Sequence, residues 1–275
     1  MACRQSAMLD RMAQANEVLA EIKMVSEKHR SILDYEPQRA ALIKYMDEQE
    51  LLEETFGSLK PVGHEDFLLA YDQWGIELDN RREVVDSLLT GFEKTSFPRL
   101  ITFIRDFPGF GPLKFSDVLN LLKYHFFDLW FLQCTECISP TGHVTSAFQT
   151  VFELSQIIGC DEKQSILKMV ERIKRLNLSL EECILLQAVV LLTSDQSDME
   201  QEEAIESLLL SYTDTLQCVL TSSHTNDLHI FPKVMQVVSD LRYISFMTRK
   251  GFTSALTTMD RSKYPLMAEI IDGFR

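Results

Sequence analysis

The chain of 275 residues contains six cysteines, too sparse to indicate a disulfide framework. Most of them stand among apolar neighbours, as the free thiols of a protein core do. No Cys-x-x-Cys pair is repeated at the spacing of a zinc finger. These observations predict a reducing compartment, and they exclude a zinc-finger DNA-binding module from this chain.

Long apolar runs and an excess of positive charge are missing as well. No run reaches the length of a membrane span and no signal peptide opens the chain, so we expect an intracellular protein without a membrane partner. The 27 Lys and Arg residues against 41 Asp and Glu residues give a net charge of −14. Because such a surface repels phosphates, we expect no direct nucleic-acid contact by this chain. Acidity that serves only solubility is the simpler interpretation.

Catalytic and metal-binding motifs are absent too. There is no Gly-x-Ser-x-Gly, no glycine-rich phosphate loop and no His-Glu-x-x-His, and the six histidines are scattered. The pair Cys134 and Cys137 lacks the second pair that zinc needs and the βαβ context of a redox motif. Two small residues on one helix face are the simpler interpretation. The sequence therefore predicts no enzyme, no metal and no cofactor.

Helical periodicity accounts for most of the chain, and no continuous strand pattern is present. Residues 6–33 predict one long helix, whose heptad stripe is too short for a coiled coil and which we expect to dock on the main body. Within residues 80–106, Pro98 predicts a kink or a restart of the helix. Further helices are predicted at residues 37–56, 65–74, 144–160, 164–176, 180–192, 202–220 and 231–256, and Pro140 and Gly142 mark a turn near residues 138–143.

Residues 97–133 are the most informative stretch. A turn containing Pro and Gly stops a first helix, and Ser116 and Asp117 then offer N-caps for a second. From Phe126 to Leu132 the second helix is apolar nearly all round, which is typical of a helix inside a protein. Gln133 follows where we expect burial to be deepest, and a buried amide without a partner costs about 1 to 3 kcal/mol.

This stretch resembles the signature region of nuclear hormone receptor ligand-binding domains. The matching positions are Ile104-Arg105, Pro108-Gly109-Phe110, Leu113, Asp117-Val118, Leu121-Leu122-Lys123 and Asp128. The spacing agrees throughout, although Arg, Val and Asp stand where the family has Lys, Gln and Glu. Residues 265–272 resemble the family's activation helix and are most similar to the vitamin D and sterol receptor branch. The resemblance spans residues 37–274.

The resemblance implies an all-α fold, a three-layer antiparallel helical sandwich with at most a small β-hairpin. It divides the chain into a hinge-like helical extension, residues 1–36, and a ligand-binding domain, residues 37–275. The implied function is to bind a lipophilic small molecule, sterol- or fatty-acid-like, and to recruit a Leu-x-x-Leu-Leu coactivator helix. Such a protein regulates transcription in the nucleus and shuttles to the cytoplasm.

The resemblance also implies a dimer. Leu241 and Arg242 match positions in the helix through which family members form homodimers or heterodimers with the retinoid X receptor. Gln196 stands where many heterodimerising members have Arg, which predicts weaker heterodimerisation.

Two sets of site residues follow from the resemblance. The ligand would contact Leu89, Phe92, Ser96, Trp130, Gln133, Cys134, Cys137, Thr248, Phe252 and Met267. The coactivator helix would contact Arg105, Val118, Leu122, Lys123, Glu269 and Ile270. Aromatic side chains that merely fill the core, and charges that are merely solvated, are the simpler alternatives.

Two rival functions remain open. A ligand-independent interaction protein would use the same fold without a DNA-binding domain, and native mass spectrometry after lipid extraction separates it from a ligand-binding protein. A helical enzyme or lipid carrier unrelated to transcription would not bind a coactivator peptide.

Overall fold

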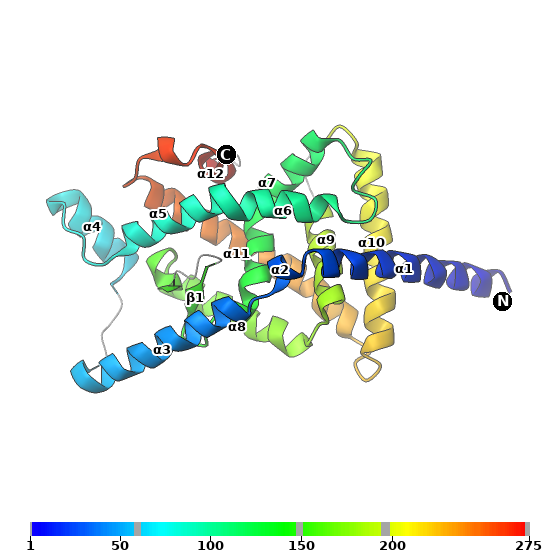
Figure 1. Ribbon diagram of the computed structural model, residues 1–275, viewed down its shortest axis with the longest axis horizontal. Helices are drawn as coiled ribbons and strands as arrows, with labels where there is room; N and C mark the ends of the chain where they lie inside the picture. The colour runs from blue at the N-terminus through cyan, green and yellow to red at the C-terminus, as the bar shows by residue number, and fades with distance from the viewer. Residues whose placement is uncertain (1, 58–61, 147–150, 194–198, 273–275) are drawn as a thin grey trace. The chain divides into compact units, whose positions relative to one another are not determined.

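The computed structural model describes residues 2–57, 62–146, 151–193 and 199–272, most of which are helical (Figure 1). The α-helices are α1 (Ala2–Lys28), α2 (Arg30–Leu33), α3 (Glu36–Phe56), α4 (His64–Trp74), α5 (Arg81–Gly91), α6 (Phe97–Arg105), α7 (Phe115–Cys134), α8 (Cys160–Leu176), α9 (Leu180–Leu192), α10 (Glu202–Ser223), α11 (Ile230–Leu256) and α12 (Pro265–Asp272). Strands β1 (His143–Thr145) and β2 (Val151–Glu153) pair antiparallel. The predicted all-α class with a small hairpin is confirmed. Over the described ranges, no helix has the length and apolarity that crossing a membrane requires.

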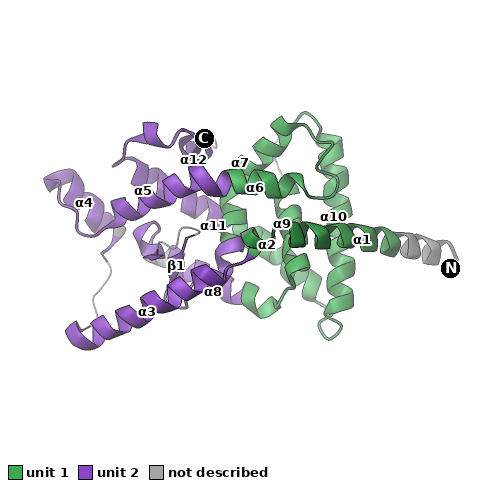
Figure 2. Cartoon of the chain, viewed as in Figure 1, with its two compact units in different colours: residues 1–33, 98–132, 173–241 green, residues 34–97, 133–172, 242–275 purple. Residues whose placement is uncertain are grey.

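The chain forms two compact units, each assembled from three separate segments (Figure 2). Unit 1 contains residues 1–33, 98–132 and 173–241, and unit 2 contains residues 34–97, 133–172 and 242–275. Within unit 1, helix α1 packs against α9 and α10, as expected of a docked helix. The division at residue 36 between an extension and a domain stays a prediction.

A π-helical turn, η1 (Phe92–Ser96), separates α5 from α6. The backbone stays helical from α5 through η1 into α6, and Pro98 follows the π-helical turn directly. Of the kink or restart predicted at Pro98, the restart is not observed, because a π-helical turn and not a new helix N-terminus precedes the proline. Single π-turns occur frequently at functional sites, because the wider turn changes which side chains face a neighbouring element.

The helix predicted over residues 6–33 is interrupted at His29, between α1 and α2. The buried His29 ring lies edge-on to Phe103, and its Nε2 is 2.5 Å from Oδ2 of Asp106. Lys28 pairs with the same carboxylate at 2.7 Å. Burial opposes the charged form of Asp106, but the hydrogen bonds from Lys28 and His29 outweigh it and keep the pKa of Asp106 below its ordinary value. These contacts fasten the end of α1 within unit 1.

The helix predicted over residues 144–160 is wrong. The described part of this segment forms β1, β2 and a 3₁₀ turn, η3 (Leu154–Gln156). Val144 and Phe152 face each other across the strands and are both buried. β-Branched residues such as Val144, Thr145 and Val151 lose rotamer freedom in a helix and pack well on a pleated surface, which favours strands. The helix that follows is present as α8.

Asp117 does not cap its own helix as predicted, because α7 begins at Phe115. Its carboxylate is completely buried in unit 1 and accepts hydrogen bonds from the backbone N–H groups of Glu200 and Gln201, each at 3.0 Å. These groups stand at the start of α10, where N–H groups have no intrahelical acceptor and negative charge is favourable. Asp117 therefore caps the turn that leads into α10, through residues 83 and 84 positions away along the chain.

Candidate functional site

The predicted ligand-contacting residues lie almost entirely in unit 2, and only Trp130 belongs to unit 1. Those of unit 2 come from α5, η1, the end of α7, the 3₁₀ turn η2 (Thr135–Cys137), α11 and α12. Ser96 and Gln133 are partly buried. The others in unit 2 are buried, namely Leu89, Phe92, Cys134, Cys137, Thr248, Phe252 and Met267.

Two aromatic rings join η1 to α11 at this place. The rings of Phe92 and Phe252 are edge-on, with centroids 5.9 Å apart. Thr248 lies one turn before Phe252 on the same face of α11. Helix α12 packs against η1, and the backbone N–H of Met267 donates to Glu93 at 3.2 Å. The structure thus brings η1 into contact with both α11 and α12, and both contacts involve predicted ligand residues.

Thr248 has a buried hydroxyl without a hydrogen-bond partner in the described part of the chain, and the residue is only 2% exposed. Thr253 on the same helix shows the usual arrangement, in which the hydroxyl donates to a carbonyl four residues earlier, that of Arg249, at 2.9 Å. An unpaired buried hydroxyl costs about 1 to 3 kcal/mol, so a bound molecule that pairs with Thr248 would remove this cost.

Thr145 on β1 has a second buried hydroxyl without a partner among the described residues, and the sequence analysis did not single it out. Thr145 directly follows Val144, a buried residue of the same strand, and this position in a strand is the sequence signal that could have singled it out. That signal was missed because residues 144–160 were predicted to be helical.

The expectation that burial is deepest at Gln133 is wrong. Gln133 and the preceding Leu132 are both partly exposed, whereas the helix is buried continuously from His125 to Phe131. The continuously buried stretch thus ends at Phe131, three residues before the end of α7. Among the predicted ligand residues, Thr248 and not Gln133 is the deeply buried one with a hydroxyl that lacks a partner in the described part of the chain.

Cys134 and Cys137 are buried thiols that are not joined in a disulfide. Burial raises the pKa of the Cys134 thiol well above its ordinary value, and the neighbouring Cys137 adds to the rise. A protonated thiol behaves as a small apolar side chain, since the thiolate is the form that binds metals and attacks electrophiles. Within the described ranges, no three His, Cys, Asp or Glu side chains are grouped so that they could hold a metal ion.

Side chains of α5 and η1 hold helix α12 within unit 2. The carboxylate of Glu93 accepts hydrogen bonds from the N–H groups of Leu266, at 3.4 Å, and Met267, at 3.2 Å. Both groups lie in the first turn of α12, which lacks intrahelical acceptors. The Tyr264 hydroxyl donates to Asp86, and burial together with this hydrogen bond raises the pKa of Tyr264. Glu93 was not among the predicted residues. Its partners are backbone N–H groups, which every residue type carries, so no sequence motif marks them.

The predicted coactivator-contacting residues are divided between the units. Unit 1 carries Arg105 on α6 and Val118, Leu122 and Lys123 on α7, while unit 2 carries Glu269 and Ile270 on α12. Arg105 and Glu269 are exposed and Lys123 is half-buried. Val118, Leu122 and Ile270 are almost completely buried, so a peptide would reach them only after neighbouring side chains move. Phe115 was not among the predicted residues, although its exposed ring has its centroid 5.8 Å from the Arg105 guanidinium carbon.

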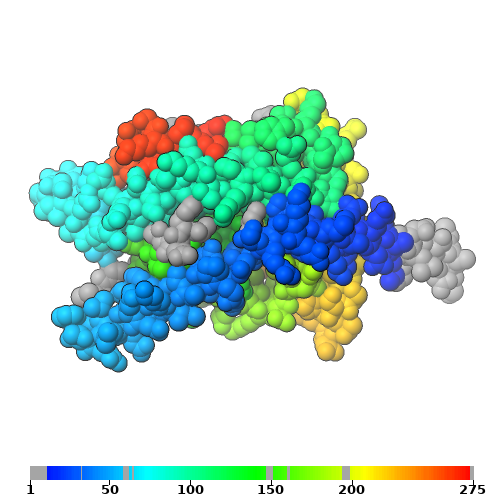
Figure 3. Space-filling view, viewed as in Figure 1, coloured from blue at the N-terminus to red at the C-terminus, as the bar shows by residue number. Residues whose placement is uncertain are grey.

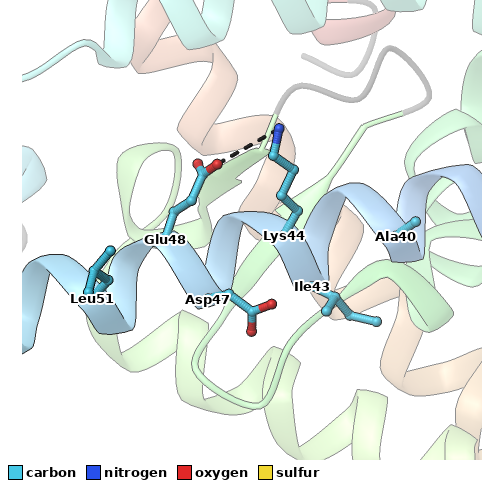
Figure 4. A pocket seen from close by; sticks show the side chains of 6 residues that line it. All are labelled: Ala40, Ile43, Lys44, Asp47, Glu48 and Leu51. Atoms are coloured by element: carbon cyan, nitrogen blue, oxygen red, sulfur yellow. Dashed lines mark ion pairs between the residues drawn. The ribbon is translucent and has the colours of Figure 1, made fainter.

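Helix α3 bears surface grooves that none of the predicted ligand residues lines. One groove of about 520 Å³ is lined by Ala40, Ile43, Lys44, Asp47, Glu48 and Leu51, all on one helix (Figure 4). It is open and shallow, unlike the concave sites that bury most of a small molecule. This surface is therefore distinct from the predicted ligand site.

Comparisons with known proteins point to one family. The sequence profile described as "Ligand-binding domain of nuclear hormone receptor" matches residues 87–253, which is more than half of the chain. Vitamin D3 receptor B of Danio rerio is 25% identical over 230 residues, which cover 75% of this chain and 52% of that protein. Nuclear receptor subfamily 1 group D member 2 of Rattus norvegicus is 27% identical over 152 residues, which cover 54% of this chain and 26% of that protein. Peroxisome proliferator-activated receptor alpha of Cavia porcellus is 24% identical over 176 residues, which cover 62% of this chain and 38% of that protein. The chain thus spans between a quarter and about half of the length of these relatives.

Proposed function

Because this chain belongs to the family of nuclear hormone receptor ligand-binding domains, we propose that it binds a lipophilic small molecule, sterol- or fatty-acid-like, in unit 2. Family members are ligand-regulated transcription factors and not enzymes. The observation that carries the proposal is the unpaired hydroxyl of Thr248 in an apolar surrounding. Apolar walls with few polar groups suit such molecules. We further propose that the protein works in the nucleus and shuttles to the cytoplasm.

Replacing Thr248 with valine tests the ligand site. Valine keeps the shape and removes an unpaired polar group, so without ligand the free energy of unfolding should stay equal or rise. With ligand the lost hydrogen bond should weaken binding by about 1 kcal/mol, roughly fivefold in Kd. The measurement is a thermal-shift titration with sterols, bile-acid-like molecules and fatty acids, in which a ligand at about 100 times its Kd adds about 2.7 kcal/mol.

The matched control for this experiment is Thr253→Val. The Thr253 hydroxyl is already bonded within α11, so its loss should leave the ligand-induced shift unchanged. Equal ligand-induced shifts of the melting temperature in the parent and in Thr248→Val would show that Thr248 does not contact the ligand. No shift with any class of molecule would favour the ligand-independent interaction protein.

We also propose that Arg105, Lys123 and Glu269 grip a coactivator helix of the Leu-x-x-Leu-Leu type. A two-turn helix is about 12 Å long, with unpaired N–H groups at its start and unpaired C=O groups at its end. Glu269 would take the partly positive start, and Arg105 and Lys123 the partly negative end. The exposure of Arg105 and Glu269 supports this assignment.

Alanine at either Lys123 or Glu269 is expected to weaken binding of such a peptide by about 1 to 3 kcal/mol, the range for charged hydrogen bonds. The measurement is fluorescence polarisation with a labelled peptide, with circular dichroism to verify folding. The control is Glu206→Ala, an exposed acid on α10 that the proposal does not use. Unchanged affinity in both folded variants would contradict the clamp.

A dimer through α11 is a third part of the proposal. This helix carries Leu241 and Arg242, and it exposes Tyr243 by 51% and Phe246 by 63%, three residues apart on one face. Exposed aromatic side chains are typical anchors of protein interfaces. Gln196, on which the expectation of weak heterodimerisation depends, lies outside the described residues.

Replacing Phe246 with aspartate is expected to weaken self-association, or association with the retinoid X receptor, by about tenfold or more, because it removes an apolar anchor and adds a charge. Analytical ultracentrifugation with and without that receptor measures the effect. Leu228→Asp, at a loop residue that is 90% exposed, is the control. Tight pairing of the parent chain with the retinoid X receptor would show that the expectation from Gln196 is wrong.

A further inference from the structure

The C-terminal half of helix α3 is uncovered. Every residue from Glu50 to Phe56 is exposed, and the segment is visible in the space-filling view, where it is light blue (Figure 3). Leu51, Leu52 and Phe56 are 64%, 47% and 75% exposed. Helices of folded proteins are stabilised mainly by packing of their apolar side chains, and gathered exposed apolar side chains mark interaction surfaces.

A groove of about 670 Å³ lies between this half of α3 and a wall made by the β-hairpin and α8, all within unit 2. Met46, Leu52 and Phe56 give the α3 side of the groove its apolar character. Three acidic residues of the same helix, Asp47, Glu50 and Glu53, also line it. The groove therefore combines apolar surface with negative charge.

The negative charge of this groove is not neutralised by the described residues. Asp47, Glu50 and Glu53 form no ion pair with any of them. Lys163 on the opposite wall is paired with Glu153. The nearby Lys44 is paired with Glu48 at 3.8 Å, and Figure 4 shows Asp47 pointing away from that pair. The three carboxylates are exposed and are therefore available to Lys or Arg side chains of a binding partner.

We propose that this groove binds a basic amphipathic helix of another protein. Its apolar side chains would pack against Leu52 and Phe56, and its Lys or Arg side chains would face the three acids of α3. A second copy of this chain is a poor occupant, because its net charge of −14 would bring acids against acids. None of the predicted coactivator-contacting residues lines the groove, so the two surfaces are separate.

The test uses the whole chain and two labelled 16-residue peptides with leucine at helical spacing. In one peptide all the positions that are not leucine are lysine, and in the second they are all glutamate. In fluorescence polarisation the lysine peptide should bind, and the glutamate peptide should bind about tenfold more weakly or not at all, because complementary charge steers and orients the helix. Raising the salt concentration should weaken binding of the lysine peptide, since the charges are exposed.

Two variants locate the binding surface. Phe56→Asp and the pair Glu50→Lys with Glu53→Lys should each weaken the lysine peptide about tenfold or more, by losing an apolar anchor or reversing the charge. All three positions are exposed, so the melting temperature should not fall. The matched control is Glu203→Lys with Glu206→Lys, which reverses two exposed acids at the same spacing on α10 and should keep most of the affinity.

Three results would overturn the proposal. Equal losses in the two charge-reversed pairs would indicate general attraction to an acidic protein. Unchanged binding by Phe56→Asp would place the peptide elsewhere, and loss of binding in Lys123→Ala would place it at the coactivator residues. Self-association that disappears in Phe56→Asp would assign the groove to a second copy instead.

Discussion

Replacing Asp117 with alanine is expected to lower the free energy of unfolding by about 3 to 5 kcal/mol, because two backbone N–H groups lose their acceptor and each such loss costs about 1 to 3 kcal/mol. The change leaves the N–H groups of Glu200 and Gln201 without their acceptor, removes the negative charge from the start of α10 and opens a space in the core of unit 1. Urea unfolding followed by circular dichroism measures the effect.

Two further variants identify the cause of this loss. Asp117→Asn keeps one acceptor oxygen but has no charge, so its stability should lie between those of the parent and the alanine variant. Glu200→Ala removes a neighbouring exposed acid, whose partners are Lys114 and Ser116, and should change stability far less. A loss in Asp117→Ala no larger than in Glu200→Ala would show that the carboxylate is not a cap.

Replacing Gly251 with alanine should destabilise the protein by about 2 to 4 kcal/mol, although alanine is the better helix former by about 1 kcal/mol. Within unit 2, α11 approaches Ile157 so closely at this position that an added Cβ would collide with the Ile157 carbonyl oxygen. A backbone atom cannot rotate away as the end of a side chain can. Either α11 or the segment after η3 must therefore move.

The matched control for Gly251 is Gly111→Ala. A Cβ at Gly111 would meet no atom within 4 Å, and its φ is not in the left-handed region. At such a position alanine should be neutral or slightly stabilising, because it restricts the unfolded chain. Thermal unfolding of both variants is the measurement. A Gly251→Ala protein that melts with the parent would mean that the close approach is absent in solution.

Local signals in the sequence predicted local structure well. Pro98 predicted an irregularity in its helix because a missing N–H acts on the turn beside it, and the π-helical turn η1 directly precedes Pro98. The helix predicted over residues 180–192 is α9, and Ser179 and Glu182 form a capping box at its start, with hydrogen bonds of 2.8 and 3.2 Å between each side chain and the other residue's backbone N–H. In both cases every interacting group lies within a few positions along the chain.

Signals that depend on distant residues were not predictable in this way. The sequence shows that Asp117 can cap a helix, but it does not show which helix. Only the fold brings the start of α10 to its carboxylate. For the same reason Gln133 was expected to be a deeply buried polar group, whereas Gln133 is partly exposed and the buried hydroxyl without a partner among the described residues is that of Thr248. Thr248 itself was assigned through the family resemblance, and its lack of a partner is a property of three-dimensional packing.

The interleaved segments of the two units have a consequence for biosynthesis. A ribosome delivers the chain from its N-terminus, yet unit 1 needs residues up to 241 and unit 2 needs residues up to 275. Neither unit is complete when its first segments emerge, so early helices such as α1 and α3 must wait for partners made much later. Contacts between segments so far apart in sequence slow folding, and waiting apolar helices are exposed to aggregation. Nascent chains of this protein should therefore depend on chaperones until the last helix, α12, has left the ribosome.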